Sequence, residues 1–201
     1  LLHHPEFKKR LKHTPVVTIS AARNMWLNAF GRIRNMLTEA GARHVGNIAL
    51  FDKHHNAVSF ITIFYWMLTG KKDRYLNIFP PPGVAEQDIL QTRDFGDVVA
   101  GHLHRDNYTG MQQTLVDKGA VQIIYKLMLI EGKARYIFAA WAKFIAKRKN
   151  QTRWLAAFKY YLFIALFLGA PILFILDAIF IRPFSSRSVK AKKNHYLLLD
   201  I

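Results

Sequence analysis

The chain has 201 residues, of which 51% are hydrophobic, and its 29 Lys and Arg outnumber its 13 Asp and Glu. It contains no cysteine, which excludes disulfides, thiolate catalysis, iron–sulfur clusters and cysteine-based zinc sites. Residues 141–201 hold eleven basic and two acidic side chains around an apolar segment. Cations that bracket an apolar stretch favour an anionic membrane surface over a nucleic-acid groove, so we predict a membrane-lipid partner and no nucleic-acid partner.

The first elements predict a βαβ unit. Val16–Ser20 is rich in β-branched residues and predicts a short buried strand. A helix is predicted from Asn24 to about Ala40, with Gly41 where a C-terminal cap is expected, and a second strand over Val45–Phe51. Short turns between them predict parallel strands. The predicted inward stripe of the helix consists of Met25, Leu27, Ala29, Phe30, Ile33, Met36 and Leu37.

The middle of the chain reads as helical. Val58–Leu68 is a dense apolar run, too short to span a bilayer, which predicts a buried or interface-lying helix. Helices are also expected over 86–104 and 111–148, the latter with a break near Gly119. The stretch Ala134–Arg148 combines an apolar face with Lys and Arg, the pattern of a basic surface helix at a membrane.

The strongest signal in the chain is an apolar segment near its C-terminus. Tyr160–Leu176 contains 17 consecutive uncharged residues. A helix of that length covers roughly 26 Å, and continuing it to Ile181 reaches the thickness of a hydrocarbon core, about 30 Å. Asp177 would then lie near one interface, as an interfacial residue rather than a proton relay. The segment predicts membrane attachment, and the alternative is a helix buried in a protein core.

The topology of this segment has two interpretations. Basic clusters lie on both sides of it, so the positive-inside rule gives no orientation. Pro171 sits at its middle and kinks a helix. The interpretation we favour here is a kinked single span, because a hairpin tip at mid-membrane leaves backbone carbonyls without partners. The alternative is a re-entrant hairpin with both basic ends on the cytoplasmic face.

Several ordered motifs resemble the dialkylresorcinol condensing enzyme-related proteins. The motifs are Val16–Ile19, Ala22–Trp26, Gly46–Leu50, Trp66–Lys72, Ile78–Pro80 and Pro82–Val84. The resemblance implies a flavodoxin-like oxidoreductase that uses FMN and is linked to dialkylresorcinol or aryl-polyene-type lipid synthesis, at an oxidation step of a lipidic ring. No Ser/Thr/Gly-rich phosphate loop occurs in the chain. We therefore expect a C-terminal portion that enters ahead of the fourth strand of that fold, with FMN bound by the full-length protein.

The resulting fold class is α/β, a partial flavodoxin-like parallel βαβ unit followed by a mostly helical region and one transmembrane or re-entrant helix. The predicted divisions are 1–57 for the α/β part, 58–150 for a helical, partly interfacial region, 151–182 for the membrane segment and 183–201 for a basic tail. The predicted location is the bacterial inner membrane with the α/β part cytoplasmic. The predicted function is a membrane-anchored oxidoreductase, and the alternative is a non-enzymatic scaffold of lipid synthesis.

Two loops follow the predicted strands, at the edge where open parallel sheets bind ligands. In the first, the resemblance implies contacts to flavin from Ser20, Ala21, Ala22, Asn24 and Trp26, with Arg23 stabilising an anionic flavin or enolate. The alternative is that Asn24 caps the helix and Trp26 packs in the core.

In the second loop, Asp52 to Asn56, a His beside an Asp predicts His54 as a general acid or base, and the alternative is a solvated loop. The pairs His54–His55 and His102–His104 lack a carboxylate pattern to complete a ligand set, so we predict no metal site.

Overall fold

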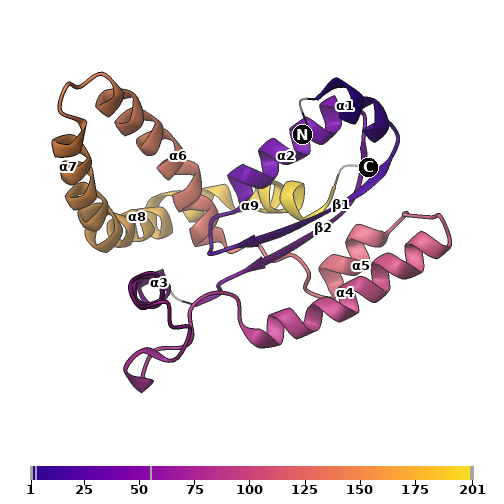
Figure 1. The fold of residues 1–201 in the computed structure, drawn as a ribbon, viewed down its shortest axis with the longest axis horizontal. Coiled ribbons are helices and arrows are strands. Elements are labelled where there is room, and N and C mark those ends of the chain that lie inside the picture. Colours follow the sequence, from indigo (N-terminus) through magenta and orange to yellow (C-terminus); the bar gives the residue numbers. More distant parts are fainter. Residues whose placement is uncertain (1, 3, 55, 200–201) are drawn as a thin grey trace. The chain divides into compact units, whose positions relative to one another are not determined.

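The computed structural model describes residues 2, 4–54 and 56–199. It is mostly helical with a single two-stranded sheet among these residues (Figure 1). Two compact units can be distinguished, and each is described by itself below. Unit 1 comprises Leu1–Ile123 and His195–Ile201, and unit 2 comprises Ile124–Asn194.

The sheet and its crossover helix confirm the predicted parallel βαβ arrangement. After α1 (Pro5–Leu11), strand β1 (Pro15–Ala22) pairs in parallel with β2 (Arg43–Phe51), and α2 (Leu27–Glu39) connects them. Helix α2 starts three residues later than predicted. It ends at Glu39, with Ala40 as the C-cap residue, and Gly41 follows with φ of +70°, the left-handed conformation that ends helices and that glycine adopts without strain.

A bulge interrupts the register of the two strands. Val16 lies opposite His44 but Val17 lies opposite Gly46, so Val45 is an extra residue in β2. In a regular strand, residues three apart point to opposite faces. Because of the bulge, His44 and Asn47 point to the same face although they are three residues apart, and both contact the hydroxyl of Thr18.

The buried face of α2 is narrower than its sequence indicates. Leu27, Phe30 and Leu37 are buried, as predicted. Met25 and Ile33 are about two-fifths exposed and Ala29 is also exposed, so the predicted place of these three residues in the inward stripe is wrong. A sheet of two strands offers a narrow platform, and only the residues on the centre line of the helix meet it.

Helices α4 (Glu86–His104) and α5 (Met111–Asp117) lie on the other side of the strands from α2 (Figure 1). The predicted helix over 86–104 is confirmed. Gly46 permits the close approach of α5, because a Cβ at this position would lie 2.9 Å from Met111 Cε and 3.3 Å from Leu115 Cδ1. Both of these side chains are fully buried, so α5 and β2 form the centre of the unit 1 core.

The outer edge of β2 is covered by groups other than a strand. Gln112 Oε1 accepts from the Asn47 backbone N–H at 2.7 Å, and the Ala120 carbonyl accepts from Ala49 N at 2.8 Å. By contrast, β1 contains no buried residue and Ile19 is 70% exposed. The edge of β2 is therefore covered, whereas the side chains of β1 are more exposed than those of β2.

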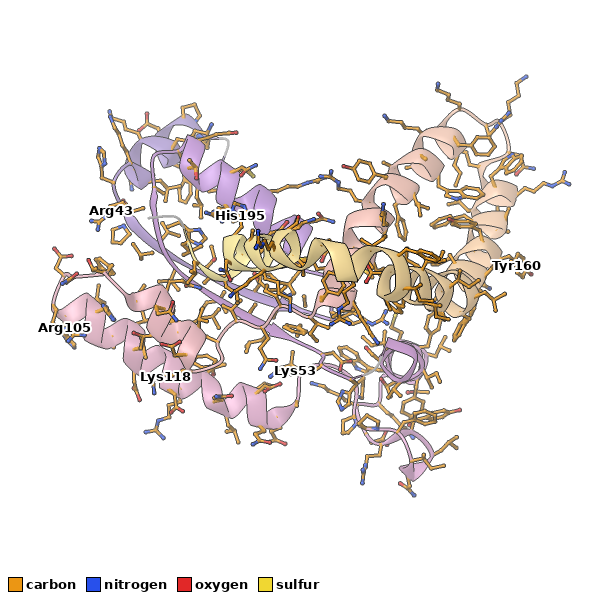
Figure 2. All side chains as sticks on the ribbon, turned by 180° about the vertical axis from the view of Figure 1, so that it is seen from behind. Arg43, Lys53, Arg105, Lys118, Tyr160 and His195 are labelled. Carbon is orange, nitrogen blue, oxygen red and sulfur yellow. The ribbon has the colours of Figure 1, made fainter. Side chains whose placement is uncertain are left out.

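The C-terminal residues return to unit 1. The carbonyl of His195, labelled in Figure 2, accepts from Arg34 Nη1 of α2 at 2.7 Å, and the Leu197 carbonyl accepts from Gln112 Nε2 of α5 at 2.6 Å. Leu199 is buried. Two helices of unit 1 thus hold the last turn of α9 (Arg182–Leu197).

Unit 2 begins with a helical hairpin. The break predicted near Gly119 is present, and α6 (Tyr125–Ala146) follows it. Helix α6 packs on α7 (Gln151–Ile164) through aromatic side chains, with Trp141 5.4 Å from Phe158 and Phe144 4.8 Å from Trp154 between ring centroids. Part of the apolar face that predicts a surface helix over 134–148 is therefore used within the protein.

The apolar segment is one continuous helix, and it changes direction between α7 and α8 (Figure 1). It runs through α7, the π-helical turn η2 (Ala165–Gly169), α8 (Ala170–Leu176) and a second π-helical turn η3 (Asp177–Ile181) into α9. Pro171 lacks an N–H, and its ring would clash with the carbonyl four residues before it, which explains the widened turn at η2. Helical dihedrals at Gly169 and Ala170 show that no tight turn occurs there.

Among the described residues, Gln151–Ile181 is the helix that is long and apolar enough to cross a membrane, and only 6% of its most apolar stretch is buried in the protein. The alternative of a helix buried in a protein core is therefore not supported. Tyr160 is 68% exposed and points away from the helices in Figure 2.

We expect Leu115→Ala to lower the free energy of unfolding by about 3 kcal/mol, because it opens a cavity in a fully buried position beside β2. Leu103→Ala on the exposed side of α4, where Leu103 is 62% exposed, is the matched control and should change stability by less than about 1 kcal/mol. Urea unfolding of both full-length variants in the same detergent measures the difference. Equal losses would contradict the assignment of α5 to the core.

Candidate functional site

A polar cluster forms at the carboxyl end of the sheet in unit 1. Because the strands are parallel, Arg23 after β1 and Asp52 after β2 arrive at the same edge. The Asp52 backbone N–H donates to the Arg23 carbonyl at 2.6 Å, which continues the strand pairing one step beyond the sheet. The two predicted loops are thus brought together by the backbone.

The carboxylate of Asp52 is the centre of the cluster. Its side chain is fully buried, and its Oδ1 accepts from the backbone N–H and the ring Nδ1 of His54, at 2.9 and 2.7 Å. Its Oδ2 accepts from the hydroxyl of Ser59 at 2.6 Å. A carboxylate can only accept, so the His54 Nδ1 carries the proton and the neutral ring has its lone pair on Nε2. The His54 side chain is 35% exposed.

Ser59 lies in the first turns of α3 (Asn56–Thr69) and connects Asp52 to Arg23. Its Oγ donates to Asp52 and accepts from Arg23 Nε at 3.1 Å. The single hydroxyl proton is therefore used, and Ser59 is a positioning residue rather than a nucleophile. Its place inside an apolar run gave no sequence signal.

Arg23 lies behind Ser59, half-buried at the base of the cluster. Burial lowers the pKa of Arg23, and the negative charge of Asp52 opposes this effect. Arginine remains cationic through such a change. Its positive charge balances the buried carboxylate through Ser59, and its contact to a bound anion stays a prediction.

The remaining predicted site residues lie apart from this cluster. Trp26 is 5% exposed and packs between Phe30 and Phe51, with ring centroids 5.4 and 6.5 Å away. This is the core position given as the alternative, and it leaves no open face for a flavin ring. Asn24 is buried and lies two residues before Trp26, the N-cap position of α2.

The other predicted flavin contacts come from the end of β1. Ser20 is partly buried, Ala21 is exposed and Ala22 is partly buried. They offer backbone groups and a single hydroxyl. Together with the buried Trp26, these residues do not fit a flavin ring-binding loop, and no step below depends on FMN.

No metal-binding group of three His, Asp or Glu side chains is found among the described residues. His55, named in one predicted pair, lies outside them. His102 Nδ1–H donates to the Asn107 carbonyl at 2.6 Å, and this contact ties His102 to the loop after α4.

A second polar cluster, which the sequence did not indicate, lies in the sheet itself. The hydroxyl of Thr18 donates to Asn47 Oδ1 at 3.0 Å and lies 2.9 Å from His44 Nε2. Since that hydroxyl proton goes to Asn47, His44 Nε2 carries its own proton and donates to Thr18. Burial, together with the positive charge of Arg34, lowers the pKa of His44 to about 4. The cluster is partly buried and structural.

No protein-family model, no curated protein and no solved structure matches the chain. The resemblance noted in the sequence therefore has no support from these comparisons, and the flavodoxin-like fold, the activity and the substrate that it implies stay predictions. The polar cluster of Arg23, Asp52, His54 and Ser59 has to be interpreted from its own geometry.

The tautomer of His54 tests this cluster directly. In ¹⁵N NMR of the neutral ring we expect the proton on Nδ1, since only that tautomer donates to Asp52. Asp52→Ala should release it to a mixture of tautomers. Ser59→Ala is the matched control, because Ser59 meets the opposite carboxylate oxygen and its loss leaves the Nδ1 contact in place. A wild-type proton on Nε2 would contradict the geometry.

His44 predicts a pH dependence of stability. Its pKa is about 4 in the folded chain and about 6.5 when unfolded, so its contribution is complete above pH 6.5 and is lost as the pH falls towards 4. Allowing for partial exposure, the loss is on the order of 1–2 kcal/mol. Melting of wild type and His44→Gln between pH 7 and 4 measures it, and the difference should shrink on acidification. The exposed His104→Gln should follow wild type, and a constant difference would refute the assignment.

Proposed function

We propose that the chain is a membrane-attached enzyme component in which His54 acts as a general base or acid on a lipid-soluble substrate. The observation that carries the proposal is the buried Asp52 carboxylate, which holds His54 with its Nε2 lone pair directed away from the cluster. A neutral imidazole oriented by a carboxylate is suited to take up a proton near neutral pH and to stabilise the cation that forms.

The helix that follows His54 in unit 1 carries an exposed apolar surface at its far end, which supports a lipid-soluble substrate. Helix α3 starts two residues after His54, and large side chains are exposed in its last turn, with Met67 and Leu68 74% and 82% exposed. The segment that follows, with the 3-10 turn η1 (Tyr75–Asn77), continues this surface at Leu76 and Ile78. An apolar surface of this kind on a soluble protein marks contact with a membrane or a partner.

Basic and aromatic side chains support the membrane over a protein partner. Lys72 Nζ lies 5.9 Å from the centre of the Trp66 ring, and Trp66 is 40% exposed. Tyr65 donates to Asp73 at 2.8 Å and its ring lies 4.5 Å from that of Tyr75, which orders the loop. Tryptophan, tyrosine and lysine together are typical of the membrane interface.

The more specific proposal, an oxidoreductase of a lipidic ring linked to dialkylresorcinol or aryl-polyene-type lipids, rests on the sequence resemblance. Removal of a ring proton is a step that such chemistry needs and that His54 could perform. The alternative is a non-enzymatic membrane module, in which the Asp52 cluster serves only to anchor α3.

Hydrogen exchange in a model ketone distinguishes the two. We expect the full chain in lipid vesicles in D₂O to exchange the hydrogens next to the carbonyl of 4-dodecylcyclohexanone at least about 100-fold faster than His54→Gln, as general-base catalysis supplies. Mass spectrometry of the extracted ketone gives the rates.

The exposed His104→Gln is the matched control, since it removes one imidazole elsewhere in unit 1, and it should exchange as wild type does. If wild type and His54→Gln both equal empty vesicles, the enzyme proposal fails and the module is favoured.

A further inference from the structure

The path of the chain after the apolar helix restricts how that helix can enter a membrane. Unit 1 contains residues before the helix and also His195–Leu199 after it, held by Arg34 and Gln112. Both of these contacts are hydrogen bonds to backbone carbonyls, and Leu199 is buried. The protein on the two sides of the apolar helix is therefore a single folded body, which has to lie on one side of a bilayer.

A single crossing is incompatible with this arrangement. If Gln151–Ile181 crossed once, Ile181 would lie opposite unit 1, and residues 182–194 would have to cross back. The fourteen helical steps from Ile181 to His195 cover about 21 Å, less than a hydrocarbon core of about 30 Å. The five cations of this stretch also exclude it from the membrane: Arg182, Arg187, Lys190, Lys192 and Lys193.

If α6 also crossed the membrane, the chain would cross twice and both of its ends would lie on the same side. The charged residues of α6 oppose such a crossing. Glu131, Lys133 and Arg135 lie near the middle of α6, where each charge costs roughly 2.5–3.5 kcal/mol. The turn after it contains Lys147, Arg148 and Lys149, and no acidic residue occurs between 132 and 176 to neutralise them. A basic turn of this kind stays on the side of synthesis.

We infer that the chain is monotopic: the apolar helix Gln151–Ile181 enters and leaves the bilayer on the same face, and unit 1, the α6–α7 turn and the C-terminal segment all face one anionic lipid surface. The bend in the helix makes this possible. Its backbone stays helical through the middle, with the Ala170 N–H bonded to the Ala165 carbonyl five residues before it. A bent helix with π turns keeps most of its carbonyls paired, which removes the objection to a re-entrant segment raised by the sequence.

The polar group inside this helix is also satisfied. Asp177 is only 4% exposed, and Tyr125 of α6 donates to its Oδ1 at 2.7 Å. Burial and this bond raise the pKa of Tyr125, which keeps the phenol as the donor. The Arg182 guanidinium lies 5.5 Å from the centre of the Tyr125 ring. These contacts hold the C-terminal part of the apolar helix against α6 within unit 2. The sequence predicts an interfacial Asp177 but not its contact with Tyr125.

Side-specific labelling tests the inference, which rests on the membrane attachment in the proposed function. The chain has no cysteine, so Lys118→Cys in unit 1, Lys147→Cys in the α6–α7 turn and Lys192→Cys in α9 each provide a unique thiol at an exposed position. Sealed membrane vesicles of both orientations that carry the full chain are treated with a membrane-impermeant maleimide. We expect all three thiols to react in one vesicle orientation and none in the other until detergent is added.

Two labelling patterns would overturn the inference. Reaction of Lys118→Cys and Lys192→Cys from opposite sides would show a single crossing. Reaction of Lys147→Cys alone from the opposite side would show that α6 crosses. Extraction at alkaline pH separates these from a failure of attachment itself, because an attached chain stays with the vesicles in every pattern, whereas release into the supernatant refutes the membrane part of the proposed function.

Discussion

The structure of unit 1 depends on the burial of one charge. Moving a carboxylate from water into a protein interior costs several kcal/mol of folding free energy unless hydrogen bonds and an opposite charge replace its hydration. Asp52 obtains its donors from the loop that follows β2 and from the first turns of α3, and the charge of Arg23 reaches it through Ser59. Satisfying this one group therefore decides where α3 begins, how Arg23 lies and which nitrogen of His54 carries the proton.

Much of the framework of unit 1 could be predicted from periodicity. Two runs of β-branched and apolar residues separated by one amphipathic helix allow few arrangements, and the predicted βαβ pairing is the one observed. The bulge at Val45 could not be predicted, because an extra residue in a strand leaves no mark in an apolar run. This bulge gathers Thr18, His44 and Asn47 into a partly buried polar cluster.

The candidate site was predictable only in part. His54 was selected because a carboxylate precedes it by two residues, and the structure shows that contact. Ser59 lies in an apolar stretch that predicts only a buried or interfacial helix. Its role as a donor to Asp52 depends on its position in three dimensions and has no mark in the sequence. The family resemblance implies a flavin contact for Trp26. In the structure, its ring instead packs against Phe30 and Phe51 in the core.

The membrane topology was beyond the sequence for a different reason. The charges on the two sides of the apolar segment are balanced, so the only information on sidedness is whether both ends return to the same folded body. The C-terminal residues are held on unit 1 through the backbone carbonyls of His195 and Leu197. Every residue has a backbone carbonyl, so a sequence pattern cannot predict these contacts. In the re-entrant arrangement that we infer, the proposed proton-transfer site of unit 1 faces the same leaflet as both basic flanks. A lipid-soluble substrate would then reach His54 from that leaflet alone, and the orientation of the chain would decide which leaflet supplies it.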